Sequence, residues 1–252
     1  MVDIIQHPCV EETMATGPFN RYASHSHAVD QAQFDAGLRA HMLRVFNYMT
    51  VGLVITGLVA FFGAQSEALV AAIFGTPLKW VVMLAPLAFI FFGFRPHTMS
   101  ASTLQTMFYL FSGLMGLSLM SVFLVFTGES VARVFFITAA TFAGTALYGY
   151  TTKADLSRFG SLLFMGLIGI VIASLVNIFV GSSALQFAIS VIGVLVFTGL
   201  TAYDTQNIKQ QYAEGWGAES NNKLAVMGAL SLYLNFINLF QMLLSLLGNR
   251  QE

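Results

Sequence analysis

The chain has 252 residues, of which 56% are hydrophobic and only 9% are charged, and its mean hydropathy is +0.74. A soluble domain carries about 25% charged residues, so lipid must cover most of this apolar surface. The net charge is −1 and Lys and Arg are scattered, which excludes a basic face for nucleic acid. A single cysteine, Cys9, excludes an intramolecular disulfide framework and a cysteine-based zinc site. We therefore predict an all-α integral membrane protein.

Residues 1–36 are predicted to form a flexible polar N-terminal tail. Its first 27 residues lack the basic and then apolar order of a signal peptide. His25 and His27 fall in this stretch and are of a type that binds metals. Two histidines in a tail are a weak signal, so we expect no firm metal site and no cofactor.

Residues 37–252 are predicted to form the membrane domain, because a bilayer span takes roughly 20 mostly apolar residues. Seven segments meet this condition: 42–63, 78–94, 102–127, 131–150, 162–180, 185–206 and 225–247. Pro86 lies inside the second segment, which predicts a kink there. The connections are short, so the sequence predicts one bundle of seven transmembrane helices.

The positions of Lys and Arg predict the orientation of the bundle. If the N-terminus is cytoplasmic, the same side also carries Arg21, Arg39, Arg44, Arg95, Lys153, Arg158, Lys209 and Lys223. The opposite side then carries only Lys79, Arg133 and Arg250. This bias predicts a cytoplasmic N-terminus, and an odd number of spans places the C-terminus outside.

Asp204 is the only carboxylate that falls within a predicted span, near the cytoplasmic end of the sixth. An ionised group at membrane depth costs a few kcal/mol unless it is hydrated or paired. Two interpretations are open at this point. Asp204 either starts the following loop together with Thr205 and Gln206, or is a charge held inside the bundle for function.

The last span carries a polar stripe. Gly228, Ser231, Asn235 and Asn238 follow one another at steps of three and four, which places them on one face of a helix. Polar side chains in lipid face other helices or a water-filled cavity. The stripe is therefore either part of an ion pathway or a hydrogen-bonded packing seam.

Arg95 follows the apolar run LAFIFFGF at the cytoplasmic end of the second predicted span. This is the side of the membrane on which Asp204 is expected. The guanidinium either reaches out to lipid phosphates, as long basic side chains commonly do, or pairs with Asp204 and closes an inner mouth.

The motifs TAYDTQNIK and SLYLNFINLF, with NIF at 177–179 and YGYTTKADLS at 148–157, resemble the Bax inhibitor-1 family, and its bacterial members in particular. The resemblance covers about residues 40–248. It implies an inner helix surrounded by six others, a place in the bacterial inner membrane, and a pH-sensitive calcium leak. It also implies a gate made by two aspartates, on the sixth and seventh helices, and locked by an arginine of the second. Asp204 matches the first aspartate and Arg95 matches the arginine.

The second aspartate has no match, because Asn235 stands where the family motif usually reads LYLDFINLF. Two close carboxylates can share one proton, which an Asp–Asn pair cannot do. The resemblance therefore carries over the fold and Asp204, whereas an amide replaces the second acid of the gate.

Two functions are consistent with these observations. The first is a pH-sensitive, calcium-permeable leak gated by Asp204 with Asn235 and Arg95, whose partners are the lipid bilayer, calcium ions and protons. The alternative is a non-conducting regulatory protein that binds a membrane-bound protease, as some proteobacterial relatives do. The sequence has no G-x-S-x-G motif and no Gly-Lys dipeptide, so neither a serine hydrolase elbow nor a phosphate-binding loop is present, and we predict that it is not an enzyme.

Overall fold

The computed structural model describes residues 18–251, with the side chains of residues 18–32 and of Glu214 left out. Contacts divide the chain into two units, residues 1–39 and 40–252. The first helix, α1 (Pro18–Gln65), begins within the predicted tail. Residues 19–36 contain no Gly or Pro and include four alanines, a composition that favours a helix. Residues 1–17 of the predicted tail lie outside the described residues.

The remaining elements are helical. In chain order they are α2 (Glu67–Phe74), α3 (Leu78–Gly93), α4 (Ala101–Val125), α5 (Gly128–Thr151), α6 (Ser157–Val180), α7 (Ser183–Gln211), the short 3₁₀ helix η1 (Glu214–Trp216) and α8 (Gly217–Leu247). Six of the described helices are long and apolar enough to cross a membrane, and α2 with α3 makes a seventh candidate if this bent pair is one span. The predicted all-α membrane fold is confirmed.

The second span differs from its prediction. Residues 67–74, expected to be part of a connection, form α2, which Ser66 caps by accepting a hydrogen bond from the backbone N–H of Leu69. α2 meets α3 at 84° across a break that contains Pro77. α3 continues as a helix through Pro86, and the kink expected there stays a prediction; the 84° bend between α2 and α3 lies earlier in the chain. With 16 residues, α3 is only about 24 Å long, less than a hydrocarbon core about 30 Å thick.

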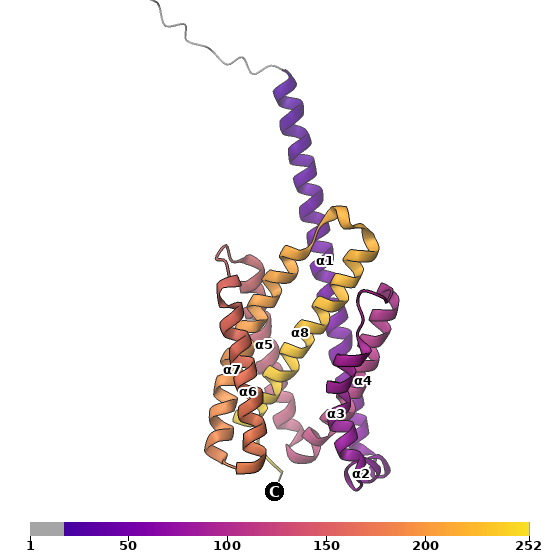
Figure 1. Ribbon diagram of the computed structural model, residues 1–252, viewed down its shortest axis with the longest axis vertical. Helices are drawn as coiled ribbons and strands as arrows, with labels where there is room; N and C mark the ends of the chain where they lie inside the picture. Colours follow the sequence, from indigo (N-terminus) through magenta and orange to yellow (C-terminus); the bar gives the residue numbers. More distant parts are fainter. Residues whose placement is uncertain (1–17, 252) are drawn as a thin grey trace, which may run out of the picture. The chain divides into compact units, whose positions relative to one another are not determined.

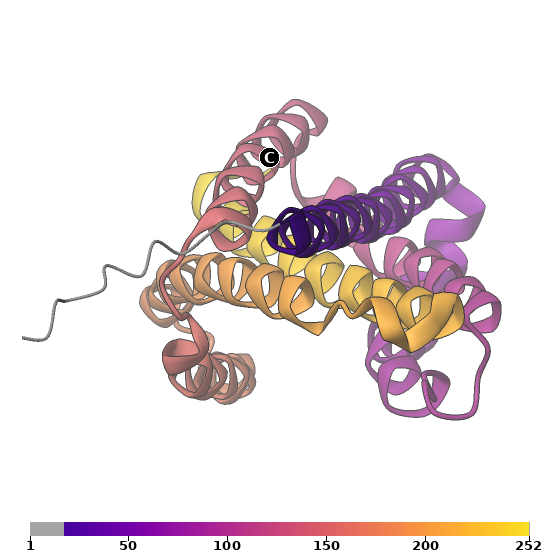
Figure 2. The same ribbon diagram turned by 90° about the horizontal axis from the view of Figure 1, so that it is seen from above.

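α8 is the inner helix of residues 40–251. Its most apolar stretch is 56% buried, whereas the corresponding figure for α6 is 6%. α8 packs against α4, α5 and α7, and Figure 1 shows it between α4 on one side and α5 and α7 on the other. α6 packs on α7 and stands at the outside, as the view from above shows (Figure 2). Polar side chains of α8 can therefore face other helices, where they do not contact lipid.

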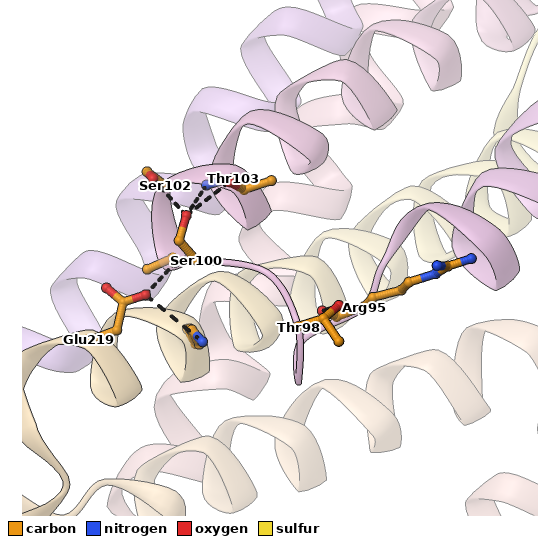
Figure 3. A network of polar contacts seen from close by, with 8 residues as sticks. Arg95, Thr98, Ser100, Ser102, Thr103 and Glu219 are labelled. Atoms are coloured by element: carbon orange, nitrogen blue, oxygen red, sulfur yellow. Dashed lines mark hydrogen bonds and ion pairs between the residues drawn. The ribbon is translucent and has the colours of Figure 1, made fainter.

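Both ends of α8 are tied to the ends of α4. In the first turn of α8, Glu219 accepts a hydrogen bond of 2.7 Å at Oε1 from the backbone N–H of Ala101, where α4 begins (Figure 3). Beyond the other end, the carbonyl of Asn249 accepts a hydrogen bond of 3.1 Å from the N–H of Thr127, just after α4. These bonds fix the height of the inner helix relative to its neighbour.

Candidate functional site

Asp204 lies inside α7, about two turns or 10 Å before its last residue, Gln211. The predicted span ended at residue 206, but the helix continues because TQNIKQQ contains neither Gly nor Pro. Asp204 therefore does not begin a loop. It is a carboxylate held within a membrane-spanning helix.

Two side chains of α8 hold the Asp204 carboxylate. The Oγ of Ser231 donates a hydrogen bond of 2.6 Å to Oδ2, and the Nδ2 of Asn235 donates one of 2.7 Å to the same oxygen. Hydrogen bonds to an ionised carboxylate are about twice as strong as those between neutral groups. The sequence-predicted pair Asp204 and Asn235 is thus brought into direct contact, in the contact between α7 and α8.

The carboxylate borders a cavity of about 560 Å³ between α6, α7 and α8. Asp204 is half-buried, and its Oδ1 accepts no hydrogen bond from any described residue. The walls are formed by residues of all three helices: Gly160, Ser161, Phe164, Leu167, Phe197, Leu200, Tyr203, Asp204, Ser231, Leu234, Asn235 and Asn238. α8 contributes Ser231, Asn235 and Asn238 to the lining, whereas α6 contributes one polar side chain, Ser161, so most of the polar groups lie along α8.

The predicted polar stripe of α8 divides into two parts. Ser231, Asn235 and Asn238 line the cavity, where the Nδ2 of Asn238 donates to the carbonyl of Leu234 at 2.9 Å. Gly228 has a different place, because a Cβ atom there would lie 3.1 Å from the side chain of Ile208 in α7. Gly228 thus provides close helix packing, and the other three provide polar groups.

Arg95 is not brought to Asp204. It is exposed in the segment after α3, where its carbonyl accepts hydrogen bonds of 3.1 Å from the N–H groups of Thr98 and Met99. Figure 3 shows its side chain pointing away from Ser100 and Glu219. The side chain makes no hydrogen bond or ion pair with any residue that the structure describes. Locking of Asp204 by Arg95 stays a prediction.

Gln206 supports the site, whereas the sequence alone predicts for it only a place in a loop that begins at Asp204. Its Oε1 accepts a hydrogen bond of 2.8 Å from the N–H of Leu156, and its Nε2 donates one of 2.8 Å to the carbonyl of Ala154. These bonds join α7 to the turn that precedes α6, and so position the outer wall of the cavity. The uninterrupted helix after Asp204 was the signal that could have revealed this role.

The lining of the cavity is rich in oxygen atoms. Calcium takes about six to eight oxygen ligands, and the described lining offers one carboxylate, two amide side chains and the hydroxyls of Ser161, Ser231 and Tyr203. Within residues 33–251, no three His, Cys, Asp or Glu side chains converge on a common metal position. The lining therefore carries oxygen atoms of the kind that calcium prefers, with one negatively charged group among them.

Comparisons with known proteins bear on the whole membrane domain. The family model described as inhibitor of apoptosis-promoting Bax1 matches residues 38–252. The inner membrane protein YbhL of Escherichia coli K12 is 46% identical over 220 residues, which cover 86% of this chain and 94% of YbhL. A protein of Caulobacter vibrioides is also 46% identical, over 247 residues that cover 93% of this chain and 99% of that protein.

Proposed function

Because the chain belongs to the Bax inhibitor-1 family and is closely similar to a bacterial inner membrane protein, we propose that it is a pH-sensitive, calcium-permeable leak of the inner membrane. The observation that carries this proposal is the Asp204 carboxylate, held by Ser231 and Asn235 on the wall of the cavity between α6, α7 and α8.

The proposed selectivity for cations comes from the charge on Asp204. It is the one carboxylate among the described lining residues, and no cation within residues 33–251 pairs with it. An unpaired charge at membrane depth is stabilised by water or by a passing cation. Protonation of Asp204 removes the charge that attracts the cation, which makes the leak sensitive to pH.

The closed form is proposed to involve Arg95. Its side chain is exposed and free of partners among the described residues, so no bond must break before it moves. α3 packs against α2 and α4, and Arg95 lies two residues after the end of α3. An ion pair with Arg95 would offset part of the cost of holding the Asp204 carboxylate away from water and would close the inner mouth.

Calcium flux into proteoliposomes, measured from about pH 5 to pH 8, tests this proposal. The key variant is Asp204→Asn, which preserves size and removes the charge. Wild-type protein is expected to conduct in a pH-dependent way, and the variant to lose both the flux and its pH dependence. Glu67→Gln is the matched control, since it removes the charge of an exposed carboxylate outside the cavity lining and is expected to leave the flux unchanged. Flux no higher than that of empty liposomes, from protein shown to be folded, overturns the proposal.

One observation favours the regulatory alternative, in which the protein binds a membrane-bound protease and conducts nothing. Asn235 occupies the position of the second acid, so the proton-sharing pair expected of the gate is lacking. Under this alternative, deletion of residues 1–36 abolishes binding of the protease, whereas a leak would be unaffected by the deletion. Co-purification of the full chain and the deletion variant with the membrane protease distinguishes the two.

A further inference from the structure

A second, apolar crevice lies on another side of the bundle, between α1 and α5. It has a volume of about 460 Å³ and its floor is Phe236 of α8. The walls are side chains of α1, from Phe46 to Leu53, and of α5, from Phe135 to Tyr150, and none of them is charged. Thr50, Ala143 and Leu147 are exposed, so the crevice opens sideways toward lipid.

The dimensions of the crevice suit a single hydrocarbon chain. From Tyr150 to Phe135 it follows α5 for about 22 Å, more than one leaflet of a hydrocarbon core about 30 Å thick. A volume of 460 Å³ over that length gives a mean cross-section of about 21 Å². A helix about 10 Å across has a cross-section of about 80 Å² and does not enter it. Ala139, Ala143 and Ala146 keep the space open, because a larger side chain at these positions would fill it.

One end of the crevice carries a positive charge. The Nζ of Lys209, in the last turn of α7, lies 5.1 Å from the centre of the Tyr150 ring and donates a hydrogen bond of 2.8 Å to the Tyr150 carbonyl. An ammonium has three donors, and no other described residue accepts from this one. Asp155, in the turn after α5, accepts a hydrogen bond of 3.0 Å from the N–H of Ser157 and forms no ion pair with Lys209. Lys209 is therefore available to a phosphate.

We propose that the crevice binds one acyl chain of a phospholipid whose phosphate lies at Lys209. An apolar cavity of this kind excludes water, and leaving it empty forfeits the contacts of its walls. Lys209 supplies the electrostatic complement to the headgroup at the level where tyrosines mark the membrane interface. This site shares no lining residue with the cavity at Asp204, so the inference does not depend on the proposed leak.

Photo-crosslinking tests the site. Purified full-length protein is reconstituted with phosphatidylglycerol that carries a diazirine in its acyl chain, and labelled peptides are identified by mass spectrometry. Peptides that contain residues 46–53 and 135–150 are expected to carry more label than those of α6, which faces lipid along most of its length. Equal labelling of α6 and the crevice would show ordinary surrounding lipid and would overturn the proposal.

Adjacent residues of α5 give a matched pair of variants. Ala143→Phe places a ring in the crevice, whereas Gly144→Phe places one in open space, since nothing lies within 4 Å of a Cβ at Gly144. The first is expected to lower crevice labelling severalfold and the second to leave it unchanged. Equal effects of the two, or no effect of Ala143→Phe, contradict the site.

The headgroup contact has its own test, which leaves the walls of the crevice intact. Lys209→Gln is expected to lower labelling about fivefold, as for the loss of one lysine–phosphate attraction near a membrane surface. Lys209→Arg keeps the charge and is expected to restore labelling. Lys153→Gln, an exposed lysine just beyond α5, controls for general surface charge. If Lys153→Gln lowers the labelling as much as Lys209→Gln does, the phosphate does not lie at Lys209.

Discussion

The amide of Asn235 donates a hydrogen bond of 2.7 Å to the Oδ2 of Asp204, so an asparagine holds the carboxylate at the centre of the candidate site. At this distance a second carboxylate would face the first directly. Two acids in such contact would share one proton and would release it only at higher pH than an isolated carboxylate does. The amide provides a donor at all pH values, which leaves Asp204 as the single titrating group of the pair.

Asn235→Asp is therefore expected to change how cation flux depends on pH. The two carboxylates would retain a proton together, and release of that proton would add a second negative charge to the cavity. Flux into proteoliposomes should increase at the alkaline end of the range, and its pH midpoint should move toward neutrality. Stopped-flow measurement of calcium entry at a series of pH values gives both quantities.

Asn238→Asp is the control for this prediction. It adds the same charge to the same cavity, but the Asn238 amide bonds the carbonyl of Leu234 and not Asp204. A similar change of pH midpoint in both variants would show that the total charge matters and that direct contact with Asp204 does not.

Much of the fold could be predicted because lipid imposes a simple pattern on the chain. All seven predicted segments coincide with helices, and the three-and-four spacing of Ser231, Asn235 and Asn238 placed them on one face. That face does meet Asp204. Apolar length and helical periodicity are local properties, so one sequence is enough to find them.

The rest depended on contacts that no local pattern contains. The role of Gln206 depends on the turn before α6, which lies 50 residues earlier in the chain. α2 was missed because eight residues are too few for a membrane span. The expected pairing of Arg95 with Asp204 rested on both residues being assigned to one side of the membrane, and a shared side does not fix a distance.

Gly149→Ala is expected to destabilise the contact between α5 and α7. A Cβ at this position would lie 2.2 Å from the backbone oxygen of Ala202, so the two helices would have to separate. Such overpacking typically costs about 1–3 kcal/mol. Thermal unfolding in detergent should show a lower midpoint. Gly144→Ala, on the same helix with open space around it, should leave the midpoint unchanged or raise it slightly.

Tyr233→Phe tests the polar contact at the opposite face of α8. The Tyr233 hydroxyl lies 2.6 Å from the Oγ1 of Thr56, and both residues are buried. Removing the hydroxyl should lower the free energy of unfolding by about 0.5–1.5 kcal/mol. The loss stays small because the Thr56 hydroxyl still donates to the carbonyl of Ser112 and is not left without a partner. Tyr109→Phe, which removes a hydroxyl from a partly exposed residue, should cost less. If Tyr233→Phe and Tyr109→Phe lower the free energy of unfolding equally, burial of the Tyr233 hydrogen bond adds nothing to stability.

Gln206→Leu is expected to loosen the turn that leads into α6. The substitution leaves the N–H of Leu156, a buried residue, without its partner, which costs about 1–3 kcal/mol, and it also removes the bond to the carbonyl of the exposed Ala154. Amide hydrogens of residues 152–160 should therefore exchange faster, as measured by mass spectrometry on protein in nanodiscs. Gln210→Leu is the control, because Gln210 is exposed one turn later on α7.

The Gln206 result also bears on the cavity, because α6 forms its outer wall and packs on α7. If exchange is faster only in the turn, the glycine contacts along the two helices hold α6 in place, such as Gly160 against Tyr203 and Gly199 against Leu163. If exchange increases along all of α6, the two Gln206 bonds are what keep the helix against α7. If exchange in the turn itself is unchanged, the two Gln206 bonds do not stabilise the turn. Gln206 is then not a support of the Asp204 site.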